Sequence, residues 1–230
     1  MEYMGRQSKT FVCVVFHHSS IRPRGYDMAK QFIDGWKKSN LDFRLVILDN
    51  ESTVNYDFLD SVEHDFLRVD DQVKAGGCTG AWNTLCKYAI DNGAEKIMGF
   101  ADDIIPNSSL KILAENTVDD NIVYAPLTDG MIDAWAFQKS DKPIEGFRKT
   151  VTSLNGFWLS FTKKFWIDKN VDKNLFLMSK NPYIDMWAGQ ELMMYIWNKE
   201  YNTLGNVIGD CWIHHTKIRS WKQAREKFNT

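Results

Sequence analysis

The fold is decided by residues 96–106, which read KIMGFADDIIP. The apolar run over residues 97–100 predicts a short strand that is buried on both faces. The strand ends at two adjacent carboxylates, Asp102 and Asp103, and Pro106 then stops sheet pairing. Two neighbouring like charges are stable in water or beside a cation. At the carboxyl end of a central strand they indicate a divalent metal that holds a phosphorylated ligand, whereas the alternative is a solvated loop.

The composition is that of an ordinary globular protein. The chain has 230 residues and a formal net charge of -2, with 44% hydrophobic and 25% charged residues. The charge excludes a polycation that binds nucleic acid over its whole surface. Four cysteines without CxxC spacing predict reduced thiols. The polar start, without an apolar h-region, and the lack of a long apolar run predict no leader and no transmembrane segment. We therefore expect a cytoplasmic protein, in the host cytoplasm if the source is viral.

Strands and helices are expected to alternate through the first half of the chain. The predicted strands cover residues 11–16, 41–48, 66–69, 96–100 and 121–125, and the predicted helices cover residues 26–39, 80–92 and 109–115. Such alternation predicts an α/β fold with a mostly parallel central sheet and helices on both faces. We expect one domain over residues 1–230, made of a nucleotide-binding half (9–125), an acceptor-binding half (126–215) and a basic tail (216–230).

The second half has a different pattern. Aromatic strands and loops are expected over residues 131–137 and 154–161, followed by a helix at about 188–199 and a strand near 207–213. In the first half, polar residues follow three of the parallel strands: His17 after the first, Asp49 after the second, and the aspartate pair after the fourth. These strand ends meet at one edge of the sheet, where open α/β sheets bind ligands.

Several short motifs, in this order, resemble those of GT-A fold glycosyltransferases of the family 2 type. Residues 48–53 (LDNEST) resemble V-D-N-x-S-T, and residues 77–83 (GCTGAWN) are similar to G-x-x-G-A-x-N. Residues 101–106 (ADDIIP) resemble the D-x-D-x-x-P metal motif, which makes this a DxD-like motif. Residues 155–159 (NGFWL) and 187–192 (WAGQEL) are similar to acceptor-side segments of that family. The resemblance runs from about residue 11 to 215 and implies a GT-A fold with a small acceptor-side sheet, in a viral or phage-type member as one form.

The sequence departs from the family motifs at two positions that bear on the metal ligands and the general base. Ala101 replaces the first aspartate of D-x-D, and Gln190 precedes Glu191 where Glu-Asp often stands. The resemblance implies that Asp103 and His215 bind Mn²⁺ or Mg²⁺, with His214 as the alternate ligand. It also implies Glu191 as general base, with Asp185 in reserve. The other predicted donor contacts are Phe16, His17, Asp49, Ser52, Gly77, Asn83, Asp102, Lys217 and Arg219, and the predicted acceptor contacts are Trp158 and Trp187.

The function that follows is a metal-dependent glycosyltransferase, hexosyl or pentosyl. It would move a sugar from a nucleotide sugar, UDP-linked, to an acceptor hydroxyl, and the family 2 likeness implies inversion at the anomeric carbon. The acceptor is either a saccharide or glycolipid, or a hydroxymethylated pyrimidine in DNA. Two other functions fit the same residues, namely a sugar-phosphate nucleotidyltransferase and a non-catalytic nucleotide-sugar binding module.

Overall fold

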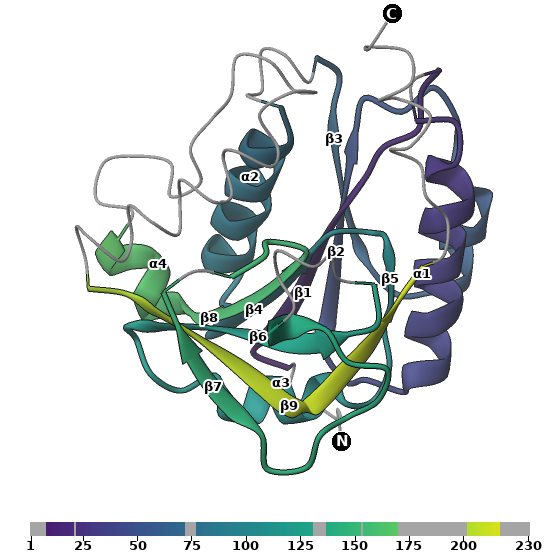
Figure 1. Cartoon of the computed structure of the whole chain (residues 1–230). Coiled ribbons are helices and arrows are strands. Elements are labelled where there is room, and N and C mark those ends of the chain that lie inside the picture. The colour runs from purple at the N-terminus through teal and green to yellow at the C-terminus, as the bar shows by residue number, and fades with distance from the viewer. Residues whose placement is uncertain are drawn as a thin grey trace, which may run out of the picture.

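The computed structural model (Figure 1) describes residues 8–20, 22–71, 77–130, 137–152, 154–169 and 202–216. Over these residues, nine strands and several helices form one α/β unit. The strands are β1 (Thr10–Phe16), β2 (Arg44–Asn50), β3 (Asp65–Val69), β4 (Lys96–Phe100), β5 (Ile104–Ile105), β6 (Ile122–Thr128), β7 (Arg148–Val151), β8 (Trp158–Thr162) and β9 (Leu204–His215). The helices are α1 (Gly25–Ser39), the 3-10 helix η1 (Asp57–Ser61), α2 (Gly77–Asp91), α3 (Leu110–Asn116) and α4 (Lys163–Lys169).

The strand order in the sheet is β3-β2-β1-β4-β8-β6-β9-β5, and β7 pairs with β9 beside this path. The first four strands are mutually parallel, as the alternating pattern predicts. β8 then joins antiparallel to both β4 and β6, and β9 lies parallel to β6. A strand from the second half of the chain is thus placed between two strands of the first half.

Helices cover both faces of the sheet, which confirms that expectation. β1 is buried on both sides, so alternate residues of this strand serve two separate clusters. Phe11, Cys13 and Val15 pack with the apolar faces of α2 and α4, which include Trp82 and Phe165. The other cluster joins the remaining residues of β1 to α1 and α3. It contains Val12, Val14 and Phe16 of β1, Phe32, Ile33 and Trp36 of α1, and Leu110 and Leu113 of α3. The sheet is therefore the middle of three layers (Figure 1).

Several predicted boundaries are wrong, each for a local reason. β2 begins at Arg44 because Asn40 ends α1 in the left-handed region, with φ of 49°. α2 begins at Gly77, so Gly80 is a buried residue of its first turn. β8 begins only at Trp158, because Asn155 Oδ1 accepts the backbone N–H of Phe157 (3.1 Å) in a turn. β5, β7 and α4 were not predicted, and the expected helix over 188–199 lies outside the described residues.

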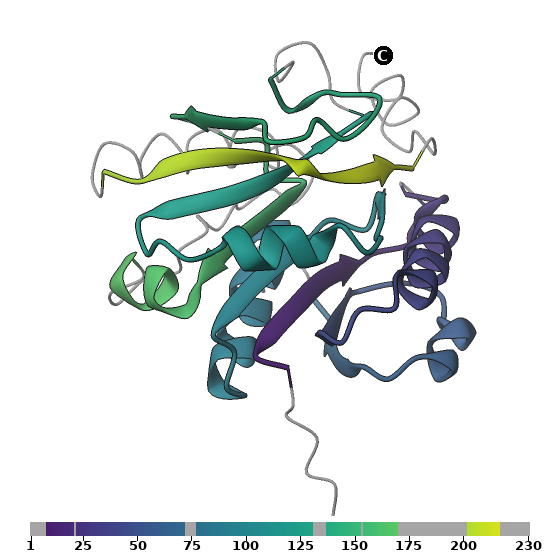
Figure 2. The ribbon, with the colours of Figure 1, turned by 90° about the horizontal axis from the view of Figure 1, so that it is seen from below.

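β9 contains an irregularity that redirects its second half. Its pairing with β6 shifts between Pro126, opposite Ile208, and Leu127, opposite Trp212, so residues 209–211 have no partner on β6. Ser109 Oγ donates a hydrogen bond to the Trp212 carbonyl (2.8 Å) and thereby ties the shifted strand to the start of α3. β9 then crosses toward the parallel strands and pairs antiparallel with β5 (Figure 2).

Candidate functional site

The loops that follow β1 and β2 are joined at the carboxyl edge of the sheet. His17 Nδ1 donates to the carbonyl of Asn50 (2.7 Å), and Ser19 Oγ lies 3.0 Å from His17 Nε2. Burial lowers the pKa of His17, which favours the neutral ring. The backbone N–H of His18 donates to Ser52 Oγ (3.0 Å). Predicted contact residues from two strands are therefore brought together at one edge.

Asp49 is buried, with 1% of its surface exposed, and both carboxylate oxygens have partners. Oδ1 accepts the backbone N–H of Ser52 (3.0 Å), which closes the turn that follows β2. Oδ2 accepts from Arg68 Nη1 of β3 (2.6 Å). Ser52 Oγ also lies 2.7 Å from the hydroxyl of Tyr56. The end of β2 is thus held rigidly at the position where a nucleotide contact is predicted.

Asp102 forms a buried ion pair with Arg22, a residue that sequence reasoning did not select. Arg22 Nη2 donates to Oδ1 (2.5 Å) and Arg22 Nη1 donates to Oδ2 (2.9 Å), which is the bidentate geometry of strong guanidinium–carboxylate pairs. The side chains are 13% and 3% exposed, respectively. Burial opposes the charge on Arg22, but Asp102 outweighs it and raises the Arg22 pKa above its usual value.

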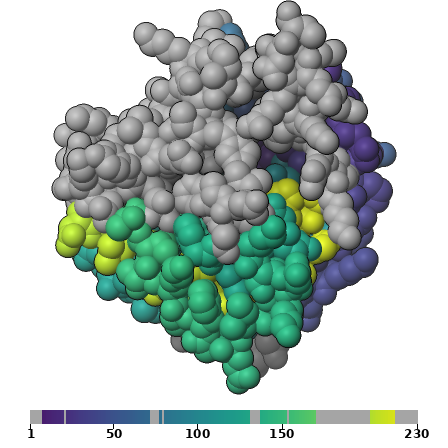
Figure 3. All heavy atoms as spheres, viewed as in Figure 1, coloured from purple at the N-terminus to yellow at the C-terminus, as the bar shows by residue number. Residues whose placement is uncertain are grey.

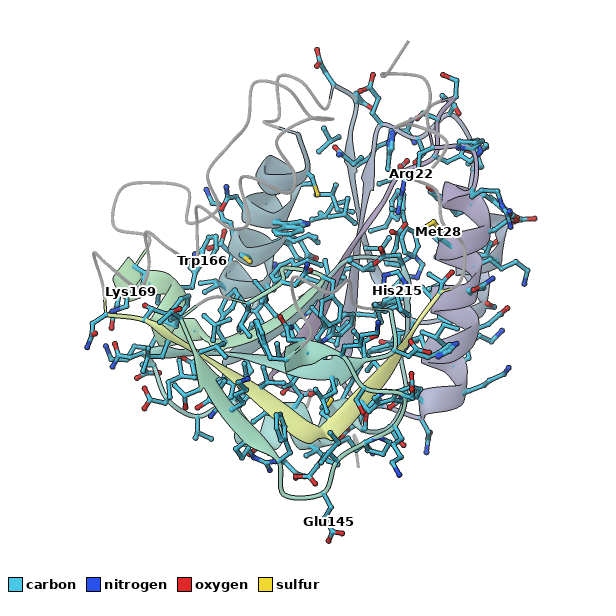
Figure 4. The ribbon with its side chains drawn as sticks, viewed as in Figure 1. Arg22, Met28, Glu145, Trp166, Lys169 and His215 are labelled. Carbon is cyan, nitrogen blue, oxygen red and sulfur yellow. The ribbon has the colours of Figure 1, made fainter. Side chains whose placement is uncertain are left out.

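Asp103 contacts His215, which the shifted second half of β9 delivers to this corner. Asp103 Oδ2 lies 3.3 Å from His215 Nε2, and the backbone N–H of Thr216 donates to the Asp103 carbonyl (2.8 Å). His215 Nδ1 donates to the carbonyl of Thr216 (2.8 Å), which turns Nε2 toward the carboxylate. The two residues predicted as metal ligands are therefore neighbours. Figure 4 shows His215 on the same side of the sheet as Arg22, and Figure 3 shows the yellow end of β9 reaching the surface.

The alternate histidine points elsewhere. His214 Nδ1 lies 2.5 Å from Asp129 Oδ2, and Asp129 Oδ1 accepts the backbone N–H of His215 (2.8 Å). Successive residues of a strand face opposite sides, so only one of the two histidines can face Asp103. The structure places His215 there, and Asp129 holds the backbone of the pair.

The His215 ring packs directly on Gly130. A Cβ added at Gly130 would lie 2.2 Å from both Cβ and Cγ of His215, so one of the two chain segments must move. We expect Gly130→Ala to destabilise the fold by roughly 1–3 kcal/mol, as overpacked sites do, and to weaken Mn²⁺ binding. Urea unfolding and Mn²⁺ titration measure the two effects. In a His215→Gly background the same substitution should cost much less, and an equal cost there would contradict the contact.

The Asp103–His215 pair predicts a pH dependence of stability in metal-free protein. Burial opposes a charged imidazole, but Asp103 outweighs it and raises the pKa of His215 from 6.5 to about 9. Burial likewise opposes a charged Asp103, but His215 and Arg22 hold its pKa below the usual value. The contribution of His215 to the free energy of unfolding is therefore fully present below pH 6.5 and is lost as the pH rises through about 9. The contribution of Asp103 to the free energy of unfolding has the opposite pH dependence, because it is lost when acid protonates the carboxylate.

Chelator-treated wild type and His215→Gln are compared by urea unfolding between pH 6 and pH 10. We expect their difference in unfolding free energy to be largest near pH 6 and to shrink at the alkaline end. Asp103→Asn should remove the same dependence. A difference that stays constant across this range would show that the pair is not ionised.

The remaining predicted site residues fall into four groups. Gly77 begins α2 with φ of 67°, and Asn83 is a buried residue of the same helix. The Phe16 ring is fully buried against Phe32 and Tyr56, so any contact with a ligand would come from its backbone. Trp158 requires a correction: its side chain is 0% exposed in the core, where it cannot act as an acceptor platform. Lying outside the described residues are Asp185, Trp187, Glu191, Lys217 and Arg219.

Three residues of the site were missed in the sequence, namely Arg22, Arg68 and Asp129. Each acts through a partner distant in the chain, so no local motif marks it. Arg22 had a weak signal, because it is a basic residue in the loop that follows the first strand. Arg68 and Asp129 follow the same logic as the predicted residues, since each lies at or just beyond the end of a strand.

The described residues fit a divalent cation in part. No three side chains of His, Cys, Asp or Glu gather into a complete cage among them, so Asp103 and His215 would be two protein ligands. Asp103 Oδ1 is buried and has no hydrogen-bond partner within the described part of the chain. A buried carboxylate oxygen without a partner is costly, and a cation would satisfy it. Carboxylate oxygen with imidazole nitrogen suits Mn²⁺, and the remaining positions are left to ligand oxygens and water.

Solved structures share this architecture, which is that of the GT-A glycosyltransferases. GalNAc-T7 with UDP, GalNAc and Mn²⁺ matches with a TM-score of 0.61 at 12% identity, over 92% of this chain and 44% of that chain. Staphylococcus aureus TarS, residues 1–349, with UDP-GlcNAc matches with a TM-score of 0.60 at 16% identity, over 91% and 59% of the two chains. TarS residues 1–349 with UDP matches with a TM-score of 0.58 at 14% identity, over 94% of this chain and 63% of that chain.

At these identities the likeness shows the fold, and the predicted fold class is confirmed. The chain spans less than two thirds of the length of each of these proteins. No protein-family profile matches the sequence, and no curated protein matches it. Within the described ranges, no helix is long and apolar enough to cross a membrane.

Proposed function

We propose that the chain is a metal-dependent glycosyltransferase that uses a nucleotide sugar with UDP as the nucleotide. The observation that carries this proposal is the corner in which Asp103 meets His215 at the carboxyl edge of the parallel strands. Asp103 comes from the middle of the described chain and His215 from its carboxyl end, and Asp103 Oδ1 is buried without a hydrogen-bond partner among the described residues. Support also comes from the solved neighbours of the same fold, which are described with UDP, UDP-GlcNAc or Mn²⁺.

The residues of the corner have separate tasks in this reaction. Asp103 and His215 Nε2 would hold Mn²⁺ or Mg²⁺, which when bound supplies positive charge against the charge that develops on the departing diphosphate. Asp129 and Thr216 orient the end of β9, and Gly130 leaves room for the imidazole. Around them, the buried ends of β1 and β2 form a preorganised wall, so little reorganisation is needed at the moment of reaction.

The acceptor side of the proposal rests on the family resemblance. Glu191, with Asp185 in reserve, would be the carboxylate that deprotonates the acceptor hydroxyl, and inversion at the anomeric carbon would follow from direct attack. A saccharide or glycolipid and a hydroxymethylated pyrimidine in DNA both remain proposed acceptors. Product analysis with each acceptor class separates them, and DNA binding would weaken steeply with salt.

A thermal-shift screen of nucleotide sugars, with Mn²⁺ or with EDTA, tests the proposal. A ligand that binds the folded chain stabilises it by about 2.7 kcal/mol at 100 times its dissociation constant. We expect a shift with a UDP-sugar in Mn²⁺ that is lost in EDTA, followed by sugar transfer to an acceptor. If no nucleotide sugar shifts the melting temperature, the proposed function is wrong.

Assays of the reaction products separate the two other functions. A nucleotidyltransferase would release pyrophosphate from a nucleoside triphosphate and a sugar phosphate, and it usually carries a free basic residue soon after the first strand. Arg22 has that place here, but it is 13% exposed and engaged by Asp102, which disfavours this function. A binding module would give the Mn²⁺-dependent shift without any transfer.

A further inference from the structure

The two adjacent aspartates of the corner differ in the state of their carboxylates. Both oxygens of Asp102 accept hydrogen bonds from Arg22, at 2.5 Å and 2.9 Å. Asp103 has one oxygen beside His215 Nε2, while Oδ1 has no partner among the described residues. Carboxylate oxygens are typical ligands of divalent cations, so each of the two aspartates is a possible ligand. Here only one of them is available as a ligand.

Arg22 is fixed in place by more than its ion pair. Its Nη1 also donates to the carbonyl of His17 (3.0 Å), and its Nη2 lies 3.8 Å from Met28 Sδ of α1 (Figure 4). Its backbone N–H donates to the Ser19 carbonyl (3.0 Å), and its carbonyl accepts from Gly25 N–H (3.0 Å). The loop between β1 and α1 therefore presents the guanidinium in one orientation.

The loop depends on close approach of its two ends. A Cβ added at Gly25 would lie 1.9 Å from the His17 carbonyl oxygen, the same oxygen that Arg22 contacts. The start of α1 thus packs against the end of β1 without a side chain between them. This packing brings Arg22 within reach of Asp102 across the edge of the sheet.

We propose that Arg22 is a positioning residue that withholds Asp102 from the cation and leaves Asp103 as its only carboxylate ligand from this pair. The planar guanidinium matches a carboxylate with two parallel hydrogen bonds, so it occupies the oxygens that a metal would need. It also cancels one negative charge, which lowers the attraction of the corner for a divalent cation. The inference concerns the site of the proposed function, but it is tested on Mn²⁺ binding alone.

The test is a Mn²⁺ titration of the whole chain, without nucleotide, followed by electron paramagnetic resonance. Arg22→Gln frees the Asp102 carboxylate, and we expect it to tighten Mn²⁺ binding roughly tenfold, because affinity rises with the number of charged ligands. Asp103→Asn should weaken binding by a similar factor. In the double variant Arg22→Gln/Asp103→Asn, the freed Asp102 should restore much of the affinity. A merely structural role of Arg22 predicts no gain in either background.

The matched control removes the pair together. Arg22→Gln/Asp102→Asn deletes one positive and one negative charge, so Mn²⁺ affinity should stay within about threefold of wild type. If this double variant weakens Mn²⁺ binding as much as Asp103→Asn does, then Asp102 is itself a ligand and the proposal is overturned. An unchanged or weaker affinity of Arg22→Gln would overturn it as well.

Folding of each variant is checked by circular dichroism. If Arg22→Gln does not fold, Arg22→Lys replaces it, since lysine keeps the charge but cannot make the paired hydrogen bonds. Its expected effect is smaller and has the same sign, and no gain in affinity counts against the proposal. Because no nucleotide is present, this pattern can hold while the UDP-sugar screen fails, or the reverse, so the two proposals fail separately.

Discussion

Asp103→Asn is expected to lower the rate of sugar transfer by roughly 10²–10³-fold, the scale seen when one preorganised electrostatic contact to a developing charge is removed. Asparagine keeps the shape of the side chain but loses the charge that would hold a cation beside the diphosphate. The carboxylate that loses its charge includes the buried Oδ1 that has no hydrogen-bond partner within the described residues. Steady-state kinetics with the UDP-sugar found in the screen measures the loss, and UDP affinity in Mn²⁺ should fall with it.

The control for Asp103→Asn is Asp141→Asn. Asp141 is exposed in the segment between β6 and β7, so this variant makes the same chemical change away from the corner. Its transfer rate should equal that of wild type. If Asp103→Asn also retains the wild-type rate and Mn²⁺ dependence while remaining folded, then Asp103 does not hold the cation.

Arg22→Met is expected to destabilise the fold by about 3–5 kcal/mol, because it leaves a buried carboxylate without its counter-charge. Asp102 is 3% exposed and Arg22 is 13% exposed, so water cannot replace the lost contacts. Burial already raises the pKa of Asp102, against the effect of Arg22, and removal of Arg22 should raise it further. Urea unfolding at neutral pH measures the free-energy difference.

Arg24→Met is a matched control only two residues away. Arg24 pairs with Asp27 on the surface, where the two side chains are 54% and 51% exposed, and such pairs contribute at most about 1 kcal/mol. The double variant Arg22→Met/Asp102→Leu removes both buried charges and should recover most of the lost stability. Equal effects of Arg22→Met and Arg24→Met would mean that the buried pair is not formed in solution.

The sequence was informative where the structure follows from local pattern. The apolar runs of β1 and β4 and the amphipathic pattern of α1 predicted the parallel half of the sheet and the layers that cover it. Polar residues directly after strands predicted the edge at which the site lies. The corner of Asp103 with His215 was reached through motif resemblance, and the structure places these residues together.

The features that were missed depend on contacts between distant segments. Nothing local reveals that β8 inserts between β4 and β6, or that residues 209–211 shift the register of β9. Arg22 reads as part of an ordinary loop until Asp102 is placed beside it. Trp158 was predicted as an acceptor contact through the family resemblance, but its position in β8, between β4 and β6, buries it.

The insertion of β8 between β4 and β6 has a consequence for how this chain can be divided. A fragment that stops near residue 125 would lack β8, which is one of the two hydrogen-bonded neighbours of β4, and both neighbours of β6. It would expose unpaired strand edges, which recruit other chains into aggregates. The segments before and after residue 125 therefore cannot be exchanged as modules with those of a protein of the same fold, and chimaeras must instead be built by grafting loops onto the intact sheet.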